Sequence, residues 1–128
     1  MAKKEFTFKG KTIAELQRLS LDDYAQLVPS RQRRSLKRGF SGPQKVLLEK
    51  LRKNQSKVPE THCRDMVVIP EMINRIIKIH SGKEFVPITI QPEMLGHCLG
   101  EFVMTRRRVA HSAPGIGATR SSAAISVK

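Results

Sequence analysis

The chain carries far more positive charge than negative charge, and this imbalance limits what it can fold into on its own. Its 128 residues include 24 lysines and arginines against 11 aspartates and glutamates, a net charge of +13. Like charges repel one another in a compact monomer, so such chains usually bind a polyanion that supplies the missing negative charge. The sequence therefore predicts a partner of that kind: RNA, DNA or an anionic membrane surface.

The excess charge is concentrated in one stretch. Between Arg31 and Lys57 there are ten basic residues and one acidic residue, a local charge of +9. Solvated helix faces usually mix both signs, whereas a face of one sign is typical of phosphate contact. Within the stretch, Arg31–Gly39 places cations on most sides of a short helix, with Leu36 as the single apolar anchor. We interpret this segment as one that inserts between RNA helices; a nuclear-localisation signal is the alternative.

A second basic cluster follows the compact part of the chain. Arg106, Arg107 and Arg108 stand together, and His111 comes shortly after. The planar guanidinium group suits phosphate oxygens bidentately. A charged exit from the domain is the alternative interpretation. The five phenylalanines and one tyrosine, by contrast, are scattered among apolar neighbours, so we expect recognition through phosphates and RNA shape rather than through stacked bases.

RNA is the polyanion that the sequence favours. The longest strongly apolar run, Met66–Pro70, is far shorter than the roughly 20 residues that span a bilayer. The N-terminus has basic residues but no apolar stretch after them, unlike a secretory signal. We therefore expect a cytoplasmic protein with no membrane partner. A free DNA-binding module remains the alternative, although such proteins present a recognition helix or a symmetric dimer face, and neither is evident in the sequence.

Metal binding and catalysis have little support. Cys63 and Cys98 each follow a histidine, but structural zinc sites take pairs of ligands spaced roughly two to four residues apart, because adjacent side chains diverge. Two-metal nucleases need clustered carboxylates, and the only close acidic pair is Asp22–Asp23, in a predicted capping turn. We expect no metal, no cofactor and no enzyme activity. The alternative is a zinc enzyme built on His62, Cys63, His97 and Cys98.

Cap signals predict short helices in the first half of the chain. The predicted starts lie at Thr12, Ser20, Ser30 and Ser41. Thr12–Glu15 fits a capping box, in which the threonine and glutamate side chains satisfy the first helical N–H groups. Val28–Pro29 stops the second helix, and Ser30 is expected to cap the third. Ser41–Pro43 starts the fourth, with proline suited to the first helical turn.

Residues 64–110 have a different pattern, rich in β-branched side chains. The candidate strands are Met66–Ile69, Arg75–His80 and Phe85–Ile90. Ser81–Gly82 is the predicted turn between the last two strands. Pro87 has no N–H to donate, which predicts that its strand lies at a sheet edge. Short helical pieces are expected at Pro92–Leu95 and Leu99–Phe102.

These patterns predict an α+β fold. We expect a small three-stranded sheet with short helices, preceded by a helical N-terminal extension and followed by an extended C-terminal tail. The predicted boundaries are 1–30 for the extension with its short helices, 31–111 for an RNA-binding core domain and 112–128 for the tail. Residues 1–11 carry four lysines around an alternating FTF and are expected to be a leader that is mobile or ordered by a partner.

From residue 33 onward the sequence resembles the universal ribosomal protein numbered nineteen of the small subunit. The stretches that carry the resemblance are RRSLKRG (33–39), VIPEMINRIIKIHSGKEFVPITIQPEMLGHCLGEFVMTR (68–106) and RVAH (108–111). They cover under half of the chain, but IHSGKEFVPI followed by EMLGHCLGEF is a specific signature. The block FTFKGKTIAELQRLSLDDYAQLVPSRQRR and the ending PGIGATRSS are similar to the archaeal and eukaryotic branch of that family.

The resemblance implies a role in translation that charge alone does not specify. Members of the family are structural constituents of the small ribosomal subunit. They bind small-subunit (16S-type) ribosomal RNA in the head, within the 3′ major domain, near the decoding and transfer RNA sites. They pair with the small-subunit ribosomal protein numbered thirteen, and their C-terminal tail reaches toward transfer RNA. The implied fold, a small α+β domain with a three-stranded sheet, agrees with the strands expected here.

The resemblance and the charge pattern together predict the residues that contact RNA. Bacterial members have a tryptophan and an arginine pair just before the first strand, where this chain reads Thr61–Asp65, so Arg64 is the one contact expected there. Gly96 and Gly100 are expected to allow tight turns or close approach rather than polar contact. The predicted RNA-binding set is Arg31, Arg33, Arg34, Lys37, Arg38, Lys45, Lys57, Arg64, Lys83, His97, Thr105, Arg106, Arg107, Arg108 and His111.

Overall fold

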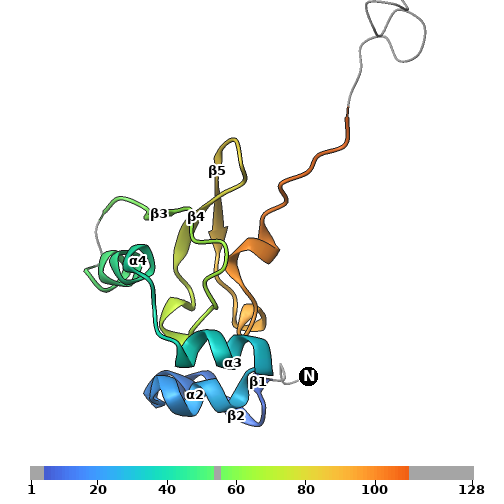
Figure 1. Cartoon of the computed structure of the whole chain (residues 1–128). Helices are drawn as coiled ribbons and strands as arrows, with labels where there is room; N and C mark the ends of the chain where they lie inside the picture. Colours follow the sequence, from blue (N-terminus) through green and yellow to red (C-terminus); the bar gives the residue numbers. More distant parts are fainter. Residues whose placement is uncertain (1–4, 54–55, 110–128) are drawn as a thin grey trace, which may run out of the picture.

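The computed structural model describes residues 5–53 and 56–109, and their fold is α+β as predicted (Figure 1). A short N-terminal hairpin and a series of helices come first, and a three-stranded sheet with 3-10 turns follows. After Val103 the described chain leaves the core as an extended segment, the orange trace in Figure 1. The predicted tail, 112–128, lies outside the described residues.

The helices begin where the cap signals predict. Helix α1 spans Ile13–Arg18, and its capping box is formed: Glu15 Oε2 accepts from the Thr12 N–H at 2.8 Å, and Thr12 Oγ1 accepts from the Glu15 N–H at 3.4 Å. Helix α2 spans Leu21–Leu27, with the Ser20 side chain as its N-cap. Helix α4 spans Gly42–Arg52 and starts with a second capping box, made by Ser41 and Gln44.

Helix α3 spans Ser30–Lys37, so the predicted third helix is confirmed, but the predicted cap is wrong. Ser30 is the first helical residue, and the N-cap is Pro29, whose carbonyl already accepts a hydrogen bond from the Arg33 N–H at 2.9 Å. No side chain caps this helix, and none of its residues is buried. The helix therefore depends on contacts with α2, which lies beside it (Figure 1).

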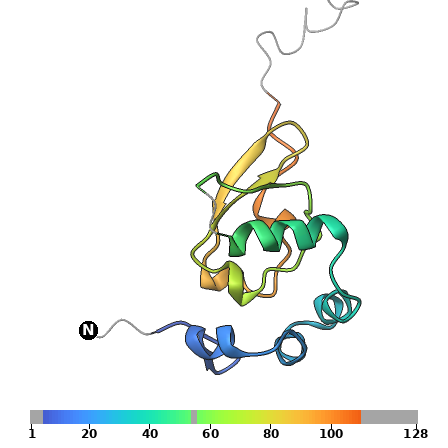
Figure 2. The same ribbon diagram turned by 90° about the vertical axis from the view of Figure 1, so that its left-hand side faces the viewer.

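The sheet is three-stranded with the order β3-β4-β5. Strand β4, Ile76–His80, pairs antiparallel with β5, Phe85–Thr89, so the predicted hairpin is confirmed. Strand β5 is at an edge, as Pro87 predicts. The third strand is β3, Glu60–Thr61, which runs parallel to β4. Figure 2 shows α4 in front of this sheet, across the direction of its strands. The 3-10 turns are η1 at Pro70–Met72, η2 at Pro92–Met94 and η3 at Leu99–Phe102.

The prediction of a strand at Met66–Ile69 is wrong. These residues are all buried, but their only β pairing within the described part of the chain is an isolated bridge between Val67 and Cys98. An apolar run indicates burial on all sides, and burial alone does not specify a strand ladder. The Val68 N–H instead donates to His97 O at 2.8 Å, and the Leu99 N–H donates to Met66 O at 2.9 Å.

One hydrophobic core joins the helical N-terminal part to the sheet. Leu16, Tyr24 and Val28 of the N-terminal part belong to the same buried cluster as Leu47 of α4 and Ile77 of β4. The domain boundary predicted at residue 30 therefore has shared apolar packing across it, and it stays a prediction. No helix within residues 5–53 or 56–109 has both the length and the apolar composition to cross a bilayer.

Part of the expected leader, residues 5–11, is described by the structure and belongs to a hairpin; that the leader is mobile or ordered by a partner stays a prediction. Strand β1, Thr7–Phe8, pairs antiparallel with β2, Lys11–Thr12. The two turn residues have positive φ, 51° at Lys9 and 79° at Gly10, as a two-residue hairpin turn requires. Phe8 anchors this hairpin, since its ring centroid lies 6.3 Å from that of Tyr24. Residues 1–4 lie outside the described part.

Candidate nucleic-acid interface

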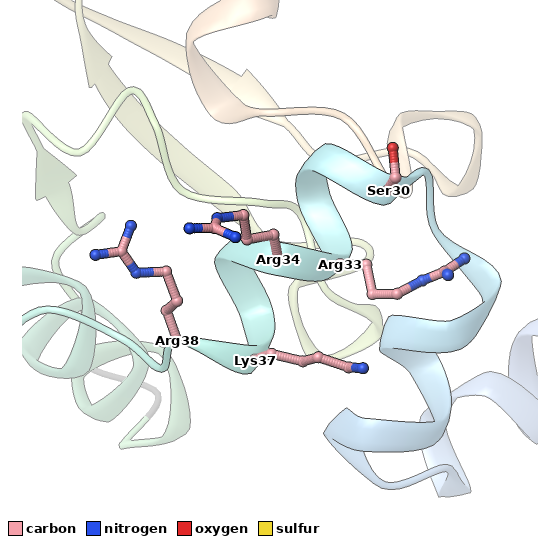
Figure 3. Close-up of a pocket in the computed structure, with 5 residues that line it drawn as sticks. All are labelled: Ser30, Arg33, Arg34, Lys37 and Arg38. Atoms are coloured by element: carbon pink, nitrogen blue, oxygen red, sulfur yellow. The ribbon is translucent and has the colours of Figure 1, made fainter.

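Helix α3 presents an exposed cluster of cations, which we call the α3 cation cluster: Arg31, Arg34, Lys37 and Arg38. The side chains of α3 border a shallow hollow lined by Ser30, Arg33, Arg34, Lys37 and Arg38 (Figure 3). In this view Arg34 and Arg38 project from one side of the helix, and Arg33 reaches toward α2. Four positive charges on about two helical turns create a potential that attracts anions.

The cluster has no carboxylate to neutralise it within the described residues. The ion pairs of residues 5–53 and 56–109 join Arg52 to Glu71, Lys78 to Glu60, His97 to Glu101 and Arg107 to Glu84. None of them involves an α3 residue. Exposed ion pairs contribute little to stability, so the fold does not need the cations of this cluster to be paired. Cations without a carboxylate partner can bind phosphates instead. The fold therefore leaves the α3 cation cluster available to an external polyanion.

Arg33 is one of the RNA contacts predicted from the sequence, but its guanidinium group donates hydrogen bonds to backbone carbonyls of the same chain. Its Nε donates to Ala25 O at 3.2 Å, and its Nη2 donates to Gln26 O at 3.2 Å and to Val28 O at 3.3 Å. The last carbonyls of a helix have no intrahelical partner and carry partial negative charge. Arg33 therefore caps the C-terminus of α2 and fixes α3 against it.

Arg64 is occupied in the same way, by three backbone carbonyls from distant parts of the chain. Its Nη1 donates to His80 O at 2.6 Å, and its Nη2 donates to Gly100 O at 2.7 Å and Val103 O at 2.6 Å. Gly100 lies so close that a Cβ there would be 2.9 Å from Arg64 Cβ and from Arg64 O. The expectation that Gly100 permits a close approach is confirmed. Arg64 thus fixes the point where the extended segment 104–109 leaves the core.

The other predicted contacts lie on several elements around the molecule. Lys45, Lys57 and Lys83 are exposed, as are Thr105, Arg106 and Arg108 on the segment after the core. Arg107 pairs with Glu84 of the β4–β5 turn. His97 Nδ1 lies 2.7 Å from Glu101 Oε2, so this histidine has a carboxylate partner that the sequence analysis did not anticipate. His111 lies outside the described residues.

A cluster of three rings was not predicted from the sequence. His62, His80 and Phe85 converge at one end of the sheet, with ring centroids 4.4 to 5.0 Å apart. We call it the ring cluster. The sequence signal for this cluster is weak, because two of the three rings are histidines. The three residues also come together only through the register of β3, β4 and β5, which the sequence does not specify.

The histidines and cysteines that suggested zinc are not gathered into a metal site. Within residues 5–53 and 56–109, no three or more side chains of His, Cys, Asp or Glu are grouped so that they could hold a metal ion. Burial raises the pKa of the Cys98 thiol, with the carboxylate of Glu101 as a further cause. A raised pKa favours the thiol over the thiolate, which is the form that binds metals.

Comparison with known protein families gives a match over more than half of the chain. Residues 34–111 match the family model described as Ribosomal protein S19. The match begins within α3, includes three members of the α3 cation cluster, and extends past the last described residue of the extended segment. It also covers the whole sheet and the ring cluster.

Proposed function

The chain belongs to the ribosomal protein S19 family, and from this premise we propose where in the small ribosomal subunit it binds and through which residues. Members of the family are structural components of the small subunit that bind its ribosomal RNA, and they are not enzymes. The proposed position is the head of a cytoplasmic small subunit, on the 3′ major domain of its RNA, near the decoding and transfer RNA sites.

The α3 cation cluster is the observation that carries the proposal. Four exposed cations with no ion pair in the described part of the chain are suited to phosphates at a junction of RNA helices. Phosphate contacts position a protein on folded RNA without reading sequence. A structural component of an RNA assembly needs contacts of this type.

The proposed contact residues are those predicted residues whose side chains the fold leaves available. Arg33 and Arg64 are left out of this set, because backbone carbonyls occupy their guanidinium groups. His97 and Arg107 stay in it, since both side chains are exposed and exposed contacts with a carboxylate contribute little to stability. The proposed set is Arg31, Arg34, Lys37, Arg38, Lys45, Lys57, Lys83, His97, Thr105, Arg106, Arg107, Arg108 and His111.

Two further partners belong to the proposal. The small-subunit ribosomal protein numbered thirteen is proposed to pack against the sheet. Membership of the family is what supports this partner. The tail, 112–128, is proposed to reach toward transfer RNA. Its sequence contains Arg120 and Lys128 as cations, so its contacts would use backbone and hydroxyl groups as well as charge.

Binding to transcribed small-subunit RNA tests the proposal. We expect the triple variant Arg34→Gln, Lys37→Gln and Arg38→Gln to bind more weakly than the wild type. Because each phosphate contact releases counterions, the slope of log binding constant against log salt concentration should also become shallower by about 2 to 3. Glutamine keeps the helix propensity close to that of arginine and lysine. The measurement is filter binding across a series of salt concentrations.

A charge-matched control separates the cluster from net charge. The variant Arg18→Gln, Lys50→Gln and Lys53→Gln removes the same number of exposed cations from α1 and the end of α4, outside the proposed contact set. It is expected to change the salt dependence much less. Equal effects of the two triple variants would contradict the assignment of α3 as the principal contact.

A further inference from the structure

The ring cluster occupies one corner of the sheet because of the strand order. Strand β3 runs parallel to β4, so His62, directly after β3, lies beside His80 at the end of β4. Strand β5 returns antiparallel, which pairs Phe85 with His80. The ring centroids of His62 and His80 are 4.4 Å apart, and each lies within 5.0 Å of the centroid of Phe85. The three rings therefore pack against one another, with His62 as the exposed member.

The fold holds these rings in place before any ligand binds. His80 Nδ1 accepts a hydrogen bond from the Gly82 N–H at 3.1 Å, which fixes the orientation of this half-buried ring. Directly after β3, the Cys63 N–H donates to Thr61 Oγ1 at 3.0 Å, and the Arg64 side chain is held by its hydrogen bonds to three backbone carbonyls. His62 is the exposed member of the cluster. It lies between Thr61 and Cys63, which this hydrogen bond joins, and two residues before the anchored Arg64.

The charges around the cluster favour a nucleic acid over a protein ligand. The carboxylates on the neighbouring strands and turn are already paired, Glu84 with Arg107 and Glu60 with Lys78. Lys83, in the turn next to the rings, is exposed and takes part in none of the ion pairs of the described residues. A flat ring beside an unpaired cation suits a nucleobase and its phosphate.

We propose that the ring cluster binds an unpaired nucleobase of the RNA, which stacks on His62 while Lys83 contacts the adjacent phosphate. The inference rests on the proposed RNA-binding function and adds a contact of a different kind. Histidine and phenylalanine rings are common stacking surfaces for bases that have left an RNA helix. His80 and Phe85 support the His62 ring. The proposal gives these rings a role beyond the recognition through phosphates and shape that the sequence predicts.

The composition of the chain makes a direct test possible. The chain has no tryptophan and a single tyrosine, Tyr24, which is buried. The substitution His62→Trp therefore places the only tryptophan of the chain in the ring cluster, where its fluorescence can be excited apart from that of Tyr24. We expect small-subunit RNA to quench this fluorescence strongly, because a stacked base contacts the indole face. The substitution Gln17→Trp, at an exposed position on α1, is the matched control and is expected to change little.

The RNA affinities of two His62 variants show whether this residue acts through its ring face or through its ring nitrogens. We expect His62→Ala to weaken binding about tenfold and His62→Phe to retain most of the affinity, because phenylalanine keeps a ring without a charge. If His62→Phe binds as weakly as His62→Ala, His62 acts through its ring nitrogens and the stacking inference fails. A His62→Trp variant that binds RNA normally but is not quenched also overturns it, while the proposed RNA-binding function stands. Quenching by an added ribosomal protein and not by RNA would assign the cluster to a protein partner instead.

Discussion

At the residue scale, Tyr24 shows how one side chain joins separate parts of this fold. Its hydroxyl donates to Val68 O at 2.8 Å and accepts from the Gly96 N–H at 3.0 Å. Both partners lie in the loops that surround the sheet, 44 and 72 residues away in sequence. The tyrosine is 1% exposed. Tyr24 therefore holds α2 against the loops around Val68 and Gly96 through a buried hydrogen-bond network, which must be fully satisfied to be stable.

Ionisation of Tyr24 gives a prediction about pH. Burial raises its pKa to about 12, above the value of about 10 for an unfolded tyrosine. The fold thus favours the protonated phenol, so the stability that it contributes is present below about pH 10 and is lost as the pH rises through about 12. Because Tyr24 is the only tyrosine, ultraviolet absorbance of tyrosinate should report its ionisation alone, near pH 12 in the folded protein.

The variant Tyr24→Phe is the control for this pH dependence. It leaves the Gly96 N–H and the Val68 carbonyl without their buried partner, so we expect it to lose about 1–3 kcal/mol of stability at neutral pH. It should lack the tyrosine-dependent part of the alkaline destabilisation. A wild-type protein whose tyrosine ionises near pH 10 while it is still folded would contradict the buried network.

The roles of the arginines mark the limit of sequence-based prediction at this scale. The charge pattern identified the basic segment, and the resemblance predicted Arg64 as an RNA contact. Neither could separate Arg33 from Arg34, because the difference lies in which carbonyls end up near each guanidinium group. Arg33 reaches the open end of α2, and Arg64 reaches carbonyls that are 16 to 39 residues away. Contacts over such separations follow from the tertiary fold.

At the scale of elements, local signals predicted helices better than strands. The capping boxes at Thr12 and Ser41 depend on residues that are three apart in sequence, so they are readable directly. Strand β3 has only two residues, and it pairs with β4 across a separation of 18 residues. Nothing in Glu60–Thr61 indicates this pairing. The more apolar run at Met66–Ile69 had the composition of a strand, but it lies in the core without a ladder.

Alanine substitutions of the adjacent Arg33 and Arg34 of α3 are predicted to change different properties: the first lowers stability, and the second lowers RNA affinity. Arg33→Ala removes the donor to three carbonyls at the end of α2, so we expect a loss of about 1–2 kcal/mol in unfolding free energy and faster amide exchange in α3. Arg34→Ala removes an exposed side chain without an ion pair in the described residues, and it should leave stability nearly unchanged while it weakens RNA binding. Urea unfolding and hydrogen exchange measure the first effect, and filter binding measures the second.

Each variant of this pair is the control for the other. If both substitutions destabilised the protein equally, the capping role of Arg33 would be wrong. If Arg34→Ala left RNA affinity at the wild-type value, Arg34 would not be an RNA contact, and the assignment of the α3 cation cluster would lose one of its four members.

At the scale of the whole molecule, one apolar core supports cations on many sides. The buried cluster draws side chains from α1, α2, α4 and the sheet. The proposed contact residues that the structure describes lie on α3 and its C-cap, α4, the β4–β5 turn, the segment after Val103 and the loops that hold Lys57 and His97. The carboxylates of the described residues pair with some cations but with none of the α3 cation cluster. This arrangement suits a protein that is surrounded by RNA rather than one that binds along a single face.

We propose that RNA phosphates supply the negative charge that this chain lacks, and the salt dependence of wild-type binding to small-subunit RNA is the decisive measurement. With about six or more phosphates neutralised, we expect the affinity to fall by about a thousandfold or more between roughly 50 and 200 mM monovalent salt. An affinity for small-subunit RNA that is nearly independent of salt over this range would contradict it.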